Sequence, residues 1–330
     1  MRAAILEDRR KLVIRDIPEP IIARDEVLIK VQYCGICGSD LHIYLEGLKT
    51  SLGHEFSGDI VEMGSDVEGY KIGEPVVIEP HGCGECYWCK RGEVGLCDNL
   101  FLRTTGRKVG AFATYVKAKY NHLLRLSDEL SYEQGAIIEP TSIAVHAVNI
   151  SGMKQGDVVA VLGLGSIGQL VARLARLSAK AVYATEISKT RIELAKNVVD
   201  EVINPNVTDP VDTILEFTNG VGADIVFECA GKVETTQESI ALARKRGTIV
   251  IPGMCFEAVE TSFIDVVLKE LTIKGSLNKN KVDFVSAFDL IKNKRIDVTP
   301  LLTDRFPLEE INDAFEKALT GECGKILVKP

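Results

Sequence analysis

The chain has 330 residues, of which 46% are hydrophobic and 26% charged, a balance typical of soluble globular proteins. Its formal net charge of −8 argues against a broad nucleic-acid-binding face, and no segment approaches the about 20 apolar residues of a membrane span. The first residues lack the apolar segment of a signal peptide, and the length suits two domains, so we expect a two-domain cytoplasmic protein.

Residues 1–138 are predicted to be rich in β-strands. Short apolar or alternating runs occur at 27–31, 58–63 and 75–78, separated by Gly, Pro and Asp. Glycine is dense here, as it is in barrel-like folds with tight corners.

Two glycine-flanked segments of this region, Gly35–His42 and Gly53–Glu55, carry candidate zinc ligands. Cys37 and His54 are ligand types that suit Zn²⁺, and a catalytic zinc takes three protein ligands and leaves one position open. Taken singly, each is more often a buried cysteine or a core histidine. Cys34 and Cys37 also form a C-x-x-C pair, but no thioredoxin-like βαβ pattern surrounds it.

Four cysteines follow in one short segment, at Cys83, Cys86, Cys89 and Cys97, far more than nine cysteines spread evenly over 330 residues would place there. Four thiolates at this spacing can complete a tetrahedral zinc site. The alternative is a local pair of disulfides, which is unusual in the reducing cytosol.

From about residue 139 to 275 strands alternate with helices, which predicts a parallel, doubly wound sheet. The expected strands are 158–162, 181–185, 223–227 and 247–251, and the expected helices include 167–177 and 190–196.

A glycine-rich turn joins the first of these strands to its helix, and its pattern G-x-G-x-x-G predicts a dinucleotide site. Glu186, after the second strand, is expected to bind the adenine ribose and to repel a 2′-phosphate, which favours NAD over NADP. Arg191 is placed to flank the ribose or adenine, or else lies on a helix surface, and it leaves an opening for NADP. The predicted cofactor-binding residues are Gly163, Gly165, Ile167, Gly168, Glu186, Arg191 and Gly253.

The tail from about residue 276 ends in an amphipathic helix at 309–319 and a strand at 325–329. We expect this tail to return to the first domain.

Taken in order, these motifs resemble the zinc-dependent medium-chain alcohol dehydrogenases, and Ile138–His146 is most similar to the polyol branch with sorbitol, butanediol and threonine dehydrogenases. The resemblance implies an α/β protein with a GroES-like, β-rich catalytic domain and a Rossmann domain. The catalytic domain would comprise 1–138 and 276–330 with a structural zinc lobe at 81–98, and the Rossmann domain would comprise 139–275.

The resemblance also implies roles for single residues. Cys37 and His54 match ligands of a catalytic zinc. Glu55 matches the adjacent carboxylate, which either binds this metal directly or lies just behind its ligands. Glu139 matches the glutamate that replaces a cysteine ligand in the polyol branch and can act through a water. Ser39 matches the hydroxyl that takes the substrate proton, and His42 matches the relay to solvent. The four clustered cysteines match a second, structural zinc, so two zinc ions per chain are expected.

The implied reaction is reversible hydride transfer between a secondary alcohol, such as a polyol, diol or cyclitol, and NAD. An amino-alcohol dehydrogenase, a carbonyl reductase and a non-catalytic NAD-binding sensor are alternatives. The loop between His42 and Gly53 is short, and the segment Gly275–Asn280, which includes Asn278 and Lys279, stands where sorbitol dehydrogenases typically have an Arg-Tyr pair. Both departures argue against sorbitol itself. The partners expected are a small alcohol or ketone and further copies of the chain, as a homotetramer or homodimer joined near 247–275.

Overall fold

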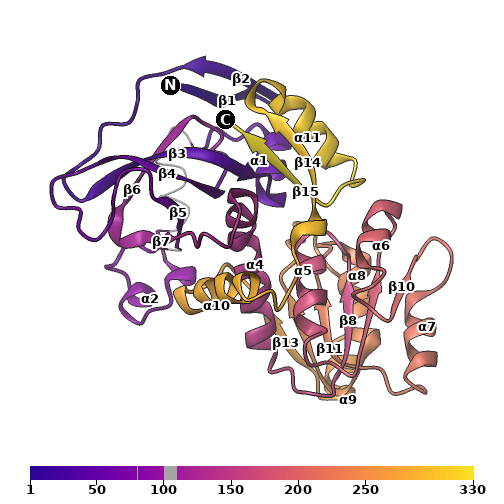
Figure 1. Cartoon of the computed structure of the whole chain (residues 1–330). Coiled ribbons are helices and arrows are strands. Elements are labelled where there is room, and N and C mark those ends of the chain that lie inside the picture. Colours follow the sequence, from indigo (N-terminus) through magenta and orange to yellow (C-terminus); the bar gives the residue numbers. More distant parts are fainter. Residues whose placement is uncertain (80, 100–109) are drawn as a thin grey trace. The chain divides into compact units, whose positions relative to one another are not determined.

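The structure is a computed structural model that describes residues 1–79, 81–99 and 110–330 (Figure 1). The chain divides into two compact units. Unit 1 consists of Met1–Ser142 with Lys279–Pro330, and unit 2 is Ile143–Asn278. No helix among the described residues is long and apolar enough to cross a membrane.

Unit 1 is built on a mainly antiparallel sheet with the order β14-β15-β3-β4-β5-β7, in which β6 also pairs with β3. A separate hairpin, β1-β2, belongs to the same unit. The strands are β1 Arg2–Asp8, β2 Lys11–Asp16, β3 Glu26–Gly35, β4 Glu55–Met63, β5 Pro75–Ile78, β6 Tyr115–Lys119, β7 Leu123–Arg125, β14 Leu302–Pro307 and β15 Lys325–Lys329.

The C-terminal strand β15 lies beside β3, with Leu327 opposite Gly35 and Val328 opposite Cys34. This pairing brings the tail of the chain next to the segment that carries Cys37. The helices of unit 1 are α1 Gly38–Glu46, α2 Tyr87–Lys90, α10 Lys281–Lys292 and α11 Ile311–Leu319, and α4 Tyr132–Ser151 continues from unit 1 into unit 2. Short 3₁₀ turns occur at η1 Val94–Leu96, η2 Tyr120–His122, η3 Thr299–Leu301 and η4 Leu308–Glu310.

The core of unit 1 joins residues from both ends of the sequence. Ile29 and Ile60 point inward from β3 and β4 and are completely buried. Tyr44 of α1 packs on Phe315 of α11 with 4.8 Å between ring centroids, and Phe112 meets the same ring. This aromatic cluster fixes α1, and with it the Cys37 segment, on the sheet.

Unit 2 is a six-stranded parallel sheet with the order β10-β9-β8-β11-β12-β13, the doubly wound topology expected from the alternating pattern. Its strands are β8 Val158–Leu162, β9 Ala181–Thr185, β10 Glu201–Ile203, β11 Ala223–Glu228, β12 Ala243–Ile251 and β13 Thr272–Gly275. Its helices are α5 Ser166–Ala175, α6 Lys189–Ala195, α7 Pro210–Phe217, α8 Val233–Leu242 and α9 Phe263–Lys269.

The strand order of unit 2 reverses between β8 and β11, the point where ligands bind in such sheets. Gly163 follows β8, Glu186 follows β9, and Gly253 lies just beyond β12. All three therefore lie at the carboxyl edge of the sheet.

Candidate metal centres and dinucleotide site

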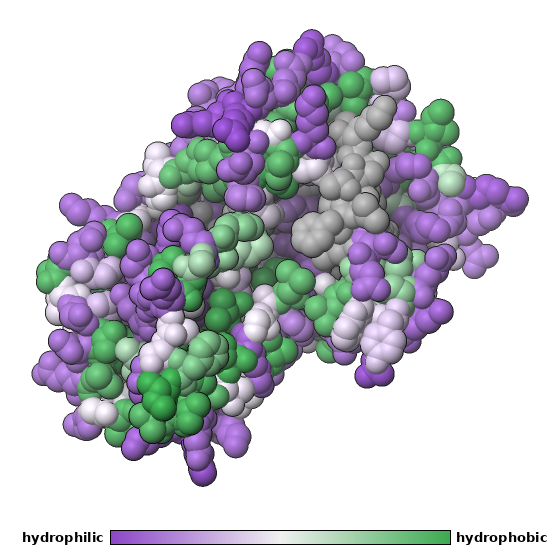
Figure 2. All heavy atoms as spheres, turned by 180° about the vertical axis from the view of Figure 1, so that it is seen from behind, coloured by the Kyte–Doolittle hydropathy of each residue, from purple (hydrophilic) through white to green (hydrophobic). Residues whose placement is uncertain are grey.

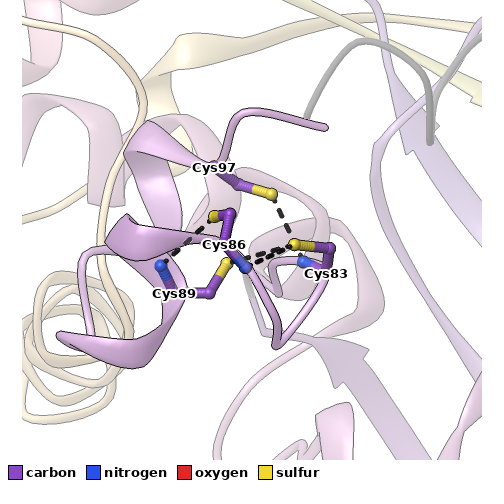
Figure 3. Close-up of side chains that lie close together, drawn as sticks. All are labelled: Cys83, Cys86, Cys89 and Cys97. Carbon is purple, nitrogen blue, oxygen red and sulfur yellow. Dashed lines mark hydrogen bonds between the residues drawn. The ribbon is translucent and has the colours of Figure 1, made fainter.

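The four clustered cysteines converge in a small lobe formed by α2 and η1 (Figure 3). The Sγ atoms of Cys83, Cys86, Cys89 and Cys97 lie within 4.8 Å of one another. Backbone N–H groups donate to the sulfurs, including Cys86 N–H to Cys83 Sγ at 3.3 Å and Cys89 N–H to Cys86 Sγ at 3.4 Å.

These hydrogen bonds favour the thiolate forms of Cys83 and Cys86. The N–H groups of Glu85 and Cys86 lower the pKa of Cys83 to about 6, and that of Cys89 lowers the pKa of Cys86. Four converging sulfurs, two of them predisposed to ionise, are the donor set of a closed structural zinc site.

A second group consists of Cys37, His54 and Glu55, whose ligand atoms also lie within 4.8 Å of one another. The sheet explains this proximity. Gly35 at the end of β3 pairs with Glu55 at the start of β4, so the residues just beyond β3 and just before β4 meet. One thiol, one imidazole and one carboxylate are a suitable three-ligand set for a catalytic zinc.

Asp40 ties the two segments of this second centre together and was not among the residues selected from sequence. Its buried carboxylate accepts the N–H of Cys37 at 3.1 Å and that of Gly53 at 3.2 Å. Its Oδ1 lies 3.6 Å from Nδ1 of His54. A carboxylate beside a ligating imidazole fixes the orientation of the ring and raises its basicity.

Glu55 is held by a buried lysine from the other end of the chain. Nζ of Lys325 lies 2.9 Å from Oε1 and 2.7 Å from Oε2, and the two side chains are 2% and 1% exposed. Burial raises the pKa of Glu55, while the ammonium of Lys325 opposes that effect. Lys325 also donates to the carbonyl of Ile36, next to Cys37.

Glu139 lies on α4, outside the group of ligand atoms formed by Cys37, His54 and Glu55. Its carboxylate forms an ion pair with Lys279. Burial alone would raise the pKa of Glu139, but the cations around it, Lys279 first and then His54 and Lys325, together hold that pKa below its usual range. Helix α4 packs on β4 one turn before Glu139, since a Cβ at Gly135 would lie 2.8 Å from Cβ of Ser57, two residues after Glu55.

Ser39 and His42 both lie on α1, which begins directly after Cys37. Side chains three residues apart share one face of a helix, so the two groups follow each other along the helix from the metal group. Both are half-buried.

The glycine-rich turn of unit 2 has the geometry of a phosphate-binding loop. Gly163 has φ +86°, a left-handed conformation that favours glycine. A Cβ at Gly168 would lie 1.9 Å from the carbonyl oxygen of Gly163, so α5 packs closely on the loop only because this side chain is absent. Gly165 caps the N-terminus of α5, and half-buried Ile167 lies in the first turn. Such a helix end attracts phosphate.

Glu186 has a structural task that the sequence did not reveal. Its Oε2 accepts the N–H of Leu164 at 2.9 Å, and its Oε1 accepts those of Ile187 and Ser188 at 2.8 and 3.0 Å. Nη1 of Arg191 lies 3.9 Å from Oε2. A carboxylate has about four acceptor positions, so Glu186 locks the glycine loop to β9 and keeps about one position for a ribose hydroxyl.

Gly253 lies where two loops approach each other closely. A Cβ there would lie 2.4 Å from Oε2 of Glu228 and 2.6 Å from the N atom of Gly231. Oε1 of Glu228 accepts the N–H groups of Ala230 and Gly231, while its Oε2 is buried and without a hydrogen-bond partner in the described part of the chain. Packing against Glu228 therefore accounts for glycine at 253.

Comparison with known proteins matches both units. Residues 23–128 match the alcohol dehydrogenase GroES-like domain and residues 166–293 match the zinc-binding dehydrogenase domain. The chain is 33% identical to sorbitol dehydrogenase of Bacillus subtilis (strain 168), over 100% of this chain and 97% of that protein. It is 35% identical to (R,R)-butanediol dehydrogenase of the same organism, with 100% of each chain covered.

Among solved structures, a zinc-binding dehydrogenase from Sinorhizobium meliloti 1021 bound to NADP superposes with a TM-score of 0.92 at 34% identity. The similarity covers 100% of this chain and 99% of that one. The predicted fold class, a GroES-like domain with a Rossmann domain, is thereby confirmed.

Proposed function

Because this chain belongs to the polyol branch of the zinc-dependent medium-chain alcohol dehydrogenases, we propose that it transfers a hydride reversibly between a secondary alcohol and NAD. The observation that carries the proposal is the convergence of Cys37, His54 and Glu55 in a chain that also has a phosphate-binding glycine loop. A polyol or diol is the substrate class, as the names of the sorbitol and butanediol relatives suggest.

In this proposal Cys37, His54 and Glu55 hold the catalytic zinc, with Glu139 beside it, and the four-cysteine lobe holds a structural zinc. Zinc, when bound, polarises the alcohol oxygen and lowers the pKa of the hydroxyl group, and the nicotinamide accepts the hydride. Asp40 orients His54, and Lys325 holds Glu55 in place.

The proton leaves through α1. Ser39 takes it from the alcohol, and His42, one helical turn further on, passes it to solvent, since an imidazole can accept a proton on one ring nitrogen and donate one from the other. Ser39→Ala is therefore expected to lower kcat for alcohol oxidation by about 10²- to 10⁴-fold, the usual contribution of a general acid–base group. Stopped-flow absorbance at 340 nm measures the effect.

The matched control is Ser65→Ala, which changes an exposed serine in a turn of the same unit and is expected to leave kcat unchanged. Alcohol oxidation by Ser39→Ala at the wild-type rate would remove Ser39 from the proton path.

Preference for NAD over NADP follows from the charge of Glu186, since a 2′-phosphate would meet a carboxylate that backbone N–H groups hold in place. Glu186→Gln removes this repulsion and is expected to reduce the NAD:NADP ratio of kcat/KM by about tenfold or more. Glu193→Gln, on the exposed side of the following helix α6, serves as the control. An unchanged ratio in Glu186→Gln would show that another group selects the cofactor.

A spectrophotometric screen at 340 nm with NAD and NADP tests the proposed function. The panel contains sugar alcohols, diols, cyclitols and amino alcohols, because one of the relatives is an L-threonine 3-dehydrogenase. Reduction of NAD by a polyol or diol is expected. A chain that binds zinc and NAD but oxidises no alcohol and reduces no ketone would instead be a sensor.

We further propose that the chain forms a homo-oligomer, dimer or tetramer, through the edge of the unit 2 sheet. Among the strands that the structure describes, β13 has a neighbour on one side only, β12. Large apolar side chains around it are exposed, and Figure 2 shows hydrophobic residues gathered on this unit, at the lower left. The exposed large apolar residues of the segment 254–277, which includes β13, are Met254, Phe256, Phe263, Ile264, Val267, Leu268, Ile273 and Leu277.

We propose a cytoplasmic location because the cysteines are not oxidised to disulfides. All nine lie in the described part of the chain and none is in a disulfide there, as a reducing compartment would keep them.

A further inference from the structure

A buried ion pair joins Glu139, beside the proposed catalytic metal centre, to Lys279, which has no part in the roles described so far. Lys279 and Glu139 lie 140 residues apart in sequence, and their side chains are only 8% and 14% exposed. Nζ of Lys279 contacts Oε1 of Glu139, its one hydrogen-bond partner in the described part of the chain. Glu139 is thus a carboxylate near the metal centre whose charge is already compensated by a cation.

The backbone that carries Lys279 is anchored to the four-cysteine lobe. Asn280 Nδ2 donates to Oε2 of Glu93 at 2.9 Å, and Asn280 Oδ1 accepts the N–H of Gly95 at 3.2 Å. A Cβ at Gly95 would lie 2.7 Å from the carbonyl oxygen of Lys279, so the lobe and this backbone are in close contact. The N–H of Asn280 also donates to Asp283 in the first turn of α10.

Four protein ligands make a closed, structural zinc site, whereas three leave a position open for substrate. Cys37, His54 and Glu55 already supply three. An uncompensated carboxylate at Glu139 would be attracted to the divalent ion and would fill the fourth position. The Lys279 ammonium competes with the metal for that carboxylate.

We propose that Lys279 is a positioning residue that holds Glu139 out of direct coordination and thereby keeps the fourth position of the catalytic metal open. The inference rests on the proposed function in one respect, that Cys37, His54 and Glu55 bind zinc. It adds a task for the lobe, which is to fix Lys279 through Asn280. In this role Lys279 acts through Glu139 and need not touch the substrate.

Cobalt substitution provides the test, because the visible bands of Co²⁺ report its coordination. The full-length protein is loaded with Co²⁺ and titrated with imidazole at about pH 8, where this neutral ligand can occupy only an open position. Lys279→Met is expected to weaken imidazole binding by about tenfold or more, within the range seen for changes in outer-shell partners. The same variant is expected to release cobalt to a chelator more slowly.

Four further variants make the result specific. Glu139→Gln added to Lys279→Met removes the competing carboxylate and is expected to restore imidazole binding, and Lys279→Arg is expected to bind like wild type. Lys281→Met changes a lysine two residues further on that pairs with Glu79, and no effect is expected. Asn280→Ala, which loosens the anchor, is expected to weaken binding in the same direction.

Wild-type imidazole affinity in Lys279→Met, or a loss that Glu139→Gln does not restore, would overturn the inference and leave the proposed function standing. Failure of wild-type protein to bind cobalt at the site of Cys37 would overturn both.

Discussion

Cys37→Ser is expected to abolish NAD-dependent alcohol oxidation and to release one of two zinc ions. The thiolate of Cys37 is the one sulfur in the proposed catalytic centre, and a serine hydroxyl is neither ionised at neutral pH nor a soft donor. The loss should exceed the about 10- to 100-fold that outer-shell changes cost. Initial rates at 340 nm and zinc content per chain are measured on the same preparation.

Cys34→Ser is the matched control because Cys34 is buried three residues earlier, at the end of β3. It is expected to keep both zinc ions and to oxidise alcohols. Equal loss of activity in the two variants, with zinc content unchanged, would instead support a redox pair of Cys34 and Cys37.

Lys325→Met is expected to cause the largest loss of stability among these single substitutions. Removing the ammonium leaves the Glu55 carboxylate without its counter-charge in a fully buried position, which costs about 3–5 kcal/mol in zinc-free protein. The only tryptophan of the chain, Trp88, lies in α2 of unit 1. Urea unfolding followed by its fluorescence therefore reports on the unit that contains the pair.

The pH dependence of this variant has a definite sign. Burial already raises the pKa of Glu55 in the wild type, and removing Lys325 takes away the strongest interaction that opposes that rise. The folded chain then holds the Glu55 proton more tightly than the unfolded chain, so stability falls as pH rises above the usual range of a glutamate, about 4.3. The deficit of Lys325→Met is expected to be smaller at pH 5 than at pH 8.

Lys329→Met is the control, since Lys329 is exposed on the same strand β15. Adding Glu55→Gln to Lys325→Met removes the unpaired charge and should recover part of the lost stability. Equal unfolding midpoints for the Lys325 and Lys329 variants would show that the Glu55–Lys325 pair contributes little.

Features encoded by short spacings could be predicted from the sequence. The glycine turn after β8 and the four cysteines of the lobe are local patterns, so the conformation of a few adjacent residues brings their groups together. Strand β8 was predicted with its observed bounds, and α5 was predicted to within two residues at its C-terminal end. The weak strands β6, β7, β10 and β13 were not predicted, because they are short and depend on neighbours for their stability.

The ion pairs of the proposed catalytic centre could not be predicted, because each joins residues far apart in sequence. Lys325 reaches Glu55 only because β15 pairs with β3, and β3 with β4. The one indication of the Lys325–Glu55 pair in the sequence is a lysine within the apolar strand Lys325–Lys329. In the sequence Lys279 is only part of a departure from the sorbitol dehydrogenase pattern, whereas in the structure it forms an ion pair with Glu139.

The position of Glu186 in the sequence predicts only one of its two roles. Its place after β9 led to a prediction of ribose binding, but position alone does not reveal that three backbone N–H groups already occupy its oxygens. Asp40 stands within the Cys37 motif, but the sequence does not single it out, because carboxylates near the start of a helix are common. Its hydrogen bond to the N–H of Gly53 depends on the tertiary structure.

The central claim, that this chain is a dehydrogenase with a catalytic metal besides its structural one, is tested most directly by counting zinc in the native protein by mass spectrometry. Two zinc ions per chain are predicted, one in the cysteine lobe and one at Cys37, His54 and Glu55. A single zinc that Cys37→Ser leaves in place would contradict the account, because the lobe alone would explain it.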